Sequence, residues 1–335
     1  MLRSLPVKLI FCLLRIAAIP TLVMPTFCFN VTIKQEFGNP LPPGTASSDQ
    51  KAGSVLAFPV FTSSAIAPQA QNTRLSITNT EPTRQAYVHL FFVGDGCSVA
   101  DNFICLTAQQ TMAFTASDFD PGTTGYVIAV ATDSAGCPAN FNFLIGDEYV
   151  KFQTGHAANL GAQAFAALAG MQPCAAGATS ATINFDGVSY SMAPRAVSMD
   201  NVPSRYDGND TLLIINRLGG DLRVGASTLG TLFGLAYDDV ESVISLATVG
   251  GCQFTRSFPF CSFPRQCFFN SFIPAGRSGW LRLYSQADIA IFGAMINLNQ
   301  NSREQANAYN QGHNLHTLTL TNAASITIPV IPPNC

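Results

Sequence analysis

The strongest constraint on the fold is an internal repeat. A turn-and-strand phrase from Asp120 to Ile128 recurs from Ile273 to Leu281, each time built around a proline and a glycine. A Gly-His pair follows each phrase, at His156 and at His313. A repeat of ~140–155 residues is longer than the unit of a solenoid, so we expect two copies of one domain.

Both copies contain short runs of β-branched and aromatic residues, such as Thr73 to Asn79 and Ala86 to Val93, separated by Gly, Pro and Asp. This pattern predicts short strands and tight turns. We therefore expect an all-β fold of two tandem antiparallel β-sandwich domains, immunoglobulin-like in type and stapled by disulfides. The expected boundaries are 29–53 for a flexible lead-in, 54–160 for repeat one, 161–195 for a connector, 196–328 for repeat two, and 329–335 for a tail.

The region between the repeats carries two local signals. Residues 157–170 are rich in alanine and are the best helix candidate in the chain. Further on, Asp186-Gly187 separates two alternating runs, a pattern typical of a β-hairpin with a type I′ turn. We therefore expect a short helical and hairpin connector.

The N-terminus resembles a targeting segment. Arg3 and Lys8 precede an apolar stretch that is interrupted by Arg15, Pro20 and Pro25. We expect residues 1–28 to be a signal peptide. The alternative is a retained membrane helix, which the central arginine and the prolines disfavour. The mature chain is then expected outside the cell or on its surface, with no membrane span, and the short strand pattern at 29–34 begins it.

Cysteine usage agrees with export. The chain has ten cysteines, and eight follow the expected leader, enough for four disulfides in an oxidising compartment. Proximity favours a Cys97–Cys105 bond, Cys137 and Cys174 could clamp the end of repeat one, and Cys335 could reach the Cys252–Cys267 loop. The disulfide candidates are Cys97, Cys105, Cys137, Cys174, Cys252, Cys261, Cys267 and Cys335.

The charge content excludes two classes of partner. Charged residues make up 11% of the chain and the net charge is −3, with no basic cluster. Nucleic acids and anionic lipid surfaces both require grouped Lys and Arg, so neither is expected as a partner.

Catalytic motifs are absent from the sequence. No G-x-S-x-G, P-loop, G-x-G-x-x-G or H-E-x-x-H is found. The acidic cluster Asp238, Asp239 and Glu241 could hold a structural calcium ion, although solvated turn residues explain it more simply. His313 and His316 are three residues apart and would face opposite sides of a single strand, so a zinc pair is expected only if the chain turns between them.

Aromatic residues crowd one loop. If they are exposed, they form a binding surface for a protein or a sugar, and if they are buried, they form a small core beneath the loop. The possible binding-loop residues are Phe254, Phe258, Phe260, Phe263, Phe268 and Phe269.

The phrases from Asn72 to Asn79 and from Phe272 to Trp280 resemble uncharacterised secreted bacterial proteins built of tandem immunoglobulin-like sandwiches, over residues 55–328. The resemblance implies a fold and carries no active site. We expect a non-enzymatic extracellular structural or adhesive protein that binds itself, as in a filament, or a surface glycan or protein. A secreted carbohydrate-binding module and a secreted hydrolase are the alternatives.

Overall fold

The computed structural model describes residues 8–10, 30–32, 46–168, 174–175, 177–258, 272–285, 287–304, 306 and 308–335. The chain divides into two compact units, Met1–Asn39 and Pro40–Cys335. In the first unit, β1 (Lys8–Ile10) pairs antiparallel with β2 (Asn30–Thr32). Most of the predicted signal peptide lies outside the described residues. The structure is 58% strand and 3% helix, and its sheets are mainly antiparallel, which confirms the all-β prediction. Among the described residues, no helix has the length and apolar character needed to span a bilayer.

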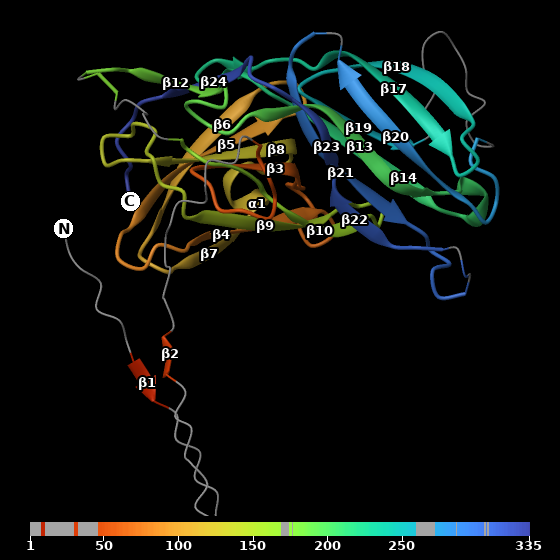
Figure 1. Cartoon of the computed structure of the whole chain (residues 1–335), viewed down its shortest axis with the longest axis horizontal. Helices are drawn as coiled ribbons and strands as arrows, with labels where there is room; N and C mark the ends of the chain where they lie inside the picture. Colours follow the sequence, from red (N-terminus) through yellow and green to blue (C-terminus); the bar gives the residue numbers. More distant parts are fainter. Residues whose placement is uncertain are drawn as a thin grey trace, which may run out of the picture. The chain divides into compact units, whose positions relative to one another are not determined.

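Two sheets in the first half of the larger unit enclose one core (Figure 1). Phe58 and Leu90 from one sheet pack with Leu75 and Leu144 from the other. The five-stranded sheet has the order β11 (Gln163–Phe165), β3 (Val55–Thr62), β8 (Thr124–Thr132), β5 (Ala86–Gly94), β6 (Val99–Leu106). The four-stranded sheet has the order β10 (Ala157–Gly161), β9 (Leu144–Lys151), β4 (Asn72–Asn79), β7 (Thr111–Thr115), and α1 (Ala116–Phe119) follows β7. We call these two sheets sandwich one.

The second half forms sandwich two in the same way. Met199 and Leu281 from one sheet pack with Leu213 and Met295 from the other. The five-stranded sheet has the order β18 (Val243–Gly250), β17 (Gly230–Asp238), β20 (Ser278–Ser285), β13 (Ala193–Pro203), β23 (His316–Thr321). The four-stranded sheet has the order β19 (Gln253–Phe258), β14 (Asp210–Leu218), β21 (Ala290–Leu298), β22 (Gln311–Asn314), and η1 (Arg205–Asp207) precedes β14.

The two sandwiches share one strand order. The strands of each half can be numbered from β3 and from β13, leaving out β15 (Gly220–Asp221) and β16 (Gly225–Ala226), which belong to another sheet. Both five-stranded sheets then read 9-1-6-3-4 and both four-stranded sheets read 8-7-2-5. The immunoglobulin-like arrangement is not confirmed. In an immunoglobulin constant domain the first strand lies beside the second, whereas here the first strand lies beside the sixth.

The repeated phrase has the same structural role in both halves. Gly122 and Gly276 have φ angles of 88° and 76°, which suit the turns that lead into β8 and β20. Gly125 and Gly279 each face the backbone of the neighbouring strand so closely that an added Cβ would lie 1.8 Å from the Val93 carbonyl oxygen and 2.3 Å from that of Tyr237, respectively.

A β-bulge interrupts the first strand of each sandwich at the same place. In β3 the register with β8 shifts between Phe58 and Phe61, and in β13 the register with β20 shifts between Met199 and Val202. The strand residue just after each bulge, Phe61 or Val202, pairs with the close-packed glycine of the repeated phrase. The two bulges differ in what they carry: Pro59-Val60 in the first and Asp200-Asn201 in the second.

A smaller sheet joins the connector to the end of the chain. Its order is β12 (Ser180–Phe185), β24 (Ala324–Pro329), β15 (Gly220–Asp221), β16 (Gly225–Ala226). The predicted hairpin is wrong in its pairing. Asp186 and Gly187 do form a turn, with the Asp186 carboxylate accepting the backbone N–H groups of Val188 and Ser189, but β12 pairs with β24 rather than with the segment after the turn.

The predicted helix at 157–170 is also wrong where it is described. Residues 157–161 form β10 and residues 163–165 form β11. Ala158, Leu160, Ala162 and Ala164 are buried at a spacing of two, which is the period of a strand. Small side chains suit this segment because it moves from the edge of one sheet to the edge of the other.

Candidate functional site

The contact between the two sandwiches combines a disulfide, buried hydrogen bonds and apolar packing. Cys97, in the β5–β6 turn, forms a disulfide with Cys252, which precedes β19, with a Cα–Cα distance of 5.1 Å. The two cysteines do not occupy equivalent positions of the repeat, because Cys97 follows the third strand of its sandwich and Cys252 follows the fourth.

Buried polar groups cross the same contact. The Asn216 side-chain N–H donates to the Pro59 carbonyl at 2.6 Å, and the Gln253 side-chain N–H donates to the Gly125 carbonyl at 2.8 Å. The Tyr126 hydroxyl donates to the Arg217 carbonyl at 2.8 Å. Burial raises the pKa of Tyr126 well above its usual value. Each bond satisfies a backbone carbonyl that burial has removed from water, and an unmade bond of this kind costs about 1–3 kcal/mol.

Apolar side chains complete the contact. Val60 and Leu160 of sandwich one form one cluster with Ile214 and Ile296 of sandwich two. A second cluster includes Tyr126 and Phe292, whose rings meet edge to face with centroids 5.5 Å apart. We call this contact, together with the Cys97–Cys252 bond, the joint. Its wholly buried apolar surface indicates that the two sandwiches act as one body.

Glu148 lies beside the joint and is wholly buried. Its Oε1 accepts the Val60 backbone N–H at 3.1 Å, while its Oε2 has no hydrogen-bond partner in the described part of the chain. Burial raises the pKa of Glu148 well above its usual value of 4.5. The folded state therefore favours the neutral acid.

This environment makes the contribution of Glu148 to stability fall as pH rises. Well below pH 4.5 the Glu148 carboxyl is protonated in both the folded and the unfolded state, so it does not lower the free energy of unfolding. As pH rises from there toward the raised folded-state pKa, only the unfolded state loses the proton, and the free energy of unfolding falls. We expect Glu148→Gln, relative to the wild type, to gain free energy of unfolding steadily from pH 4 to pH 8. Urea denaturation across this range measures the difference, with the exposed Glu304→Gln as control. A difference that stays constant with pH would contradict the assignment.

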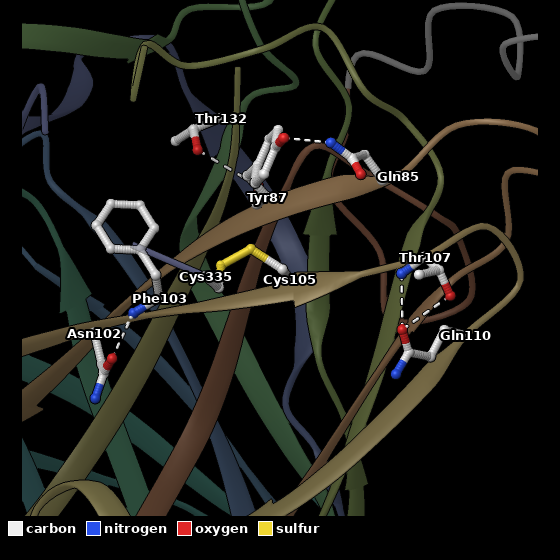
Figure 2. Close-up of a disulfide and its surroundings, with 9 residues drawn as sticks. All are labelled: Gln85, Tyr87, Asn102, Phe103, Cys105, Thr107, Gln110, Thr132 and Cys335. Atoms are coloured by element: carbon white, nitrogen blue, oxygen red, sulfur yellow. Dashed lines mark hydrogen bonds between the residues drawn. A yellow bond between two sulfur atoms is a disulfide. The ribbon is translucent and has the colours of Figure 1, made fainter. Parts of the chain in front are cut away.

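Two further disulfides among the described residues attach the connector and residue 335 to sandwich one. Cys137 pairs with Cys174, and Cys335 pairs with Cys105 of β6 with a Cα–Cα distance of 6.0 Å (Figure 2). The predicted Cys97–Cys105 bond and the predicted attachment of Cys335 to the Cys252–Cys267 loop are therefore wrong. Cys261 and Cys267 lie outside the described residues.

The acidic cluster forms a turn rather than a converging set of ligands. The Asp238 carboxylate accepts the backbone N–H groups of Val240 and Ser242, at 3.0 and 2.7 Å. Burial alone would raise the pKa of Asp238, but these hydrogen bonds outweigh it and lower the pKa. Asp239 forms an ion pair with Arg277, and Glu241 has a φ of 67° in the same turn. The Asp238 carboxylate therefore stabilises the β17–β18 turn by accepting hydrogen bonds from the backbone of that same turn.

The aromatic loop is only partly described. Phe254 and Phe258 belong to β19, where they are 6% and 2% exposed in the core of sandwich two. These two side chains do not contribute to a surface for binding. Phe260, Phe263, Phe268 and Phe269 lie outside the described residues.

The four histidines have different environments. His89 is buried between Phe91 and Phe103, and its Nε2 lies 2.8 Å from an Asp101 carboxylate oxygen. His156 is buried in the joint, where its Nε2 lies 2.9 Å from the Asp210 carbonyl. His313 and His316 converge on Asp200, a residue that the sequence did not single out. No local sequence pattern marked Asp200, because its position beside the histidines depends on the bulge in β13.

Comparisons with known proteins leave the family open. No family model and no curated protein matches the chain. Among solved structures, Ruminococcus gnavus β-glucuronidase is matched at 9% identity with a TM-score of 0.14. The match covers 86% of this chain, and it spans 38% of the length of that enzyme. A likeness this low carries no information about activity.

Proposed function

We propose that the protein is a non-enzymatic extracellular structural or adhesive protein whose two sandwiches work as a single rigid body. The joint is the observation that carries this proposal. A disulfide, hydrogen bonds to buried carbonyls and two apolar clusters all connect the same pair of sandwiches. A large apolar interface holds two domains fixed relative to each other, whereas small polar interfaces permit domain motion.

The disulfides also determine how a pulling force crosses the molecule. A force applied between the start of β3 and residue 335 passes from Cys105 directly to Cys335. The bond bridges a sequence separation of 230 residues, which includes all of sandwich two. A protein that carries load between these two points would benefit from this arrangement, because the force bypasses the residues between Cys105 and Cys335. The three cysteine pairs also fit an extracellular location.

The weakly charged composition favours association of such bodies. With a net charge of −3 over 335 residues, repulsion between copies is small. The segment that includes β2 could supply a strand to the edge of a neighbouring copy, a common mode of β-augmentation. A filament or surface layer is therefore the assembly we expect.

Electron microscopy of the native secreted material tests the proposal, with size-exclusion chromatography of the purified chain beside it. We expect ordered multimers in both. Deletion of residues 29–45 should convert them to monomers, while the surface change Asp239→Asn should leave assembly intact. Dispersed monomers in the native material, together with glycoside hydrolysis that Asp238→Asn abolishes, would overturn the proposal in favour of an enzyme.

A further inference from the structure

Three side chains with metal-binding atoms meet on the surface of sandwich two. The Nε2 atoms of His313 and His316 each lie 3.1 Å from the same oxygen, Oδ1 of Asp200. The candidate ligand atoms of the three residues all lie within 4.8 Å of one another. Their side chains are between about a third and three-fifths exposed, so water can reach the space between them.

The fold brings the two histidines together by turning the chain between them. His313 belongs to β22 at the edge of the four-stranded sheet, and His316 belongs to β23 at the edge of the five-stranded sheet. Leu315, between them, is nearly buried and donates its N–H to the Gly293 carbonyl at 2.9 Å. This crossover removes the alternation that would place the two imidazoles on opposite faces of one strand.

The bulge in β13 orients the Asp200 carboxylate toward the two histidines. His316 pairs with Ser198, two residues before Asp200, so the histidine and the carboxylate occupy neighbouring positions on two paired strands. The next residue, Asn201, has a φ of 47°, and its side chain and carbonyl exchange hydrogen bonds with the Gln311 side chain at 3.2 and 3.1 Å. Bulges commonly redirect a side chain in this way.

The hydrogen bonding of His313 leaves its other nitrogen available. Its Nδ1 lies 2.8 Å from the Asn314 carbonyl oxygen, which can only accept, so Nδ1 carries a proton. In the neutral ring Nε2 then bears the lone pair, and it points toward Asp200. Histidines that bind metals are typically oriented by such a bond from the second nitrogen to a carbonyl or carboxylate.

We propose that Asp200, His313 and His316 bind a divalent transition-metal ion of the zinc class. Two ligand atoms that each lie ~2.0 Å from a tetrahedral zinc ion are about 3.3 Å apart. The two Nε2–Oδ1 distances of 3.1 Å are close to that separation, and the candidate ligand atoms of all three residues lie within 4.8 Å of one another, so small side-chain rotations would place them around one ion. Two imidazole nitrogens favour zinc over calcium or magnesium, which prefer oxygen ligands. Water would complete the coordination.

The first repeat has lost, or never had, the same set of ligands. Its bulge carries Pro59 and Val60, which offer no metal-binding side chain, and its Gly-His histidine, His156, is buried in the joint with Nε2 bonded to the Asp210 carbonyl. The bulge is therefore used for contact between sandwiches in the first copy and for a metal in the second. The ion would tie β13, β22 and β23 together at one edge of sandwich two.

Titration calorimetry with zinc chloride tests the site on the full oxidised chain, after free thiols are alkylated and bound metals are removed with a chelator. We expect saturable binding of one ion per chain and no comparable binding of Ca²⁺. Asp200→Asn and His316→Gln should each weaken zinc binding at least tenfold, whereas Asp239→Asn, an exposed carboxylate elsewhere on sandwich two, should not.

Cobalt provides a second readout that does not depend on heat. Co²⁺ bound by the wild type should gain visible absorption from imidazole coordination, and Asp200→Asn should lose it, with circular dichroism showing that the variant is folded. Absence of saturable zinc binding by the wild type would overturn the proposal. Equal binding by Asp200→Asn and the wild type would do so as well, because it would show that zinc is held elsewhere.

Discussion

Gly125→Ala is expected to destabilise the protein by at least about 3 kcal/mol, the upper part of the usual cost of overpacking. The added methyl group would lie 1.8 Å from the Val93 carbonyl oxygen, and the backbone of β5 can move aside only by breaking its pairing with β8. Gly279→Ala should act in the same direction through the Tyr237 carbonyl, at 2.3 Å.

Gly96 supplies a matched control for this experiment. A Cβ at Gly96 would meet nothing within 4 Å, so Gly96→Ala should leave stability nearly unchanged. Urea denaturation followed by far-ultraviolet circular dichroism compares the three variants with the wild type. Equal midpoints for Gly125→Ala and Gly96→Ala would show that the repeated phrase is not held by this close approach.

Removing the joint disulfide is the second change with a large expected effect. The double variant Cys97→Ser, Cys252→Ser should lose about 2–5 kcal/mol, since the bond closes a sequence separation of 155 residues in the unfolded chain. The unfolding of the two sandwiches should also become separable. The single tryptophan, Trp280, lies in β20 and stacks on Tyr237, so its fluorescence reports on sandwich two alone.

The measurement is therefore a comparison of two probes during urea denaturation. Trp280 fluorescence and far-ultraviolet circular dichroism should give coincident transitions in the wild type and divergent ones in the double variant. The control is Cys137→Ser, Cys174→Ser, which removes a bond of sequence separation 37 that does not cross the joint. It should cost about 1 kcal/mol less by loop-closure entropy and keep the transitions coincident. Coincident transitions in the joint variant would mean that the noncovalent contacts couple the sandwiches unaided.

The all-β character could be predicted because local patterns determine it. Alternating runs such as Thr73 to Asn79 become strands whose inner side chains reach one core, and the turns at Gly122 and Gly276 need residues that tolerate a positive φ. The segment at 157–165 was misassigned because its alanine content favours a helix in isolation. In the structure the segment forms strands instead, because every second residue is buried against strands that are distant in sequence.

The joint and the histidine cluster could not be predicted, since both depend on pairings between distant residues. Proximity in sequence suggested bonding Cys97 to Cys105, yet these cysteines occupy a turn and an edge strand that face different partners. Asp200 looks like an ordinary strand residue until the bulge redirects it. One clue was present in the sequence. It indicated that His313 and His316 could bind a metal together only if the chain turned between them.

The bond between Cys105 and Cys335 has a consequence for how the protein matures. Synthesis proceeds from the N-terminus, so Cys97 and Cys105 emerge together and long before either native partner. During that interval the neighbouring thiols can oxidise to each other, and this premature bond must be exchanged when Cys252 and Cys335 arrive. Efficient production should therefore depend on a thiol–disulfide isomerase where the disulfides form, and oxidation without one should trap a shuffled form.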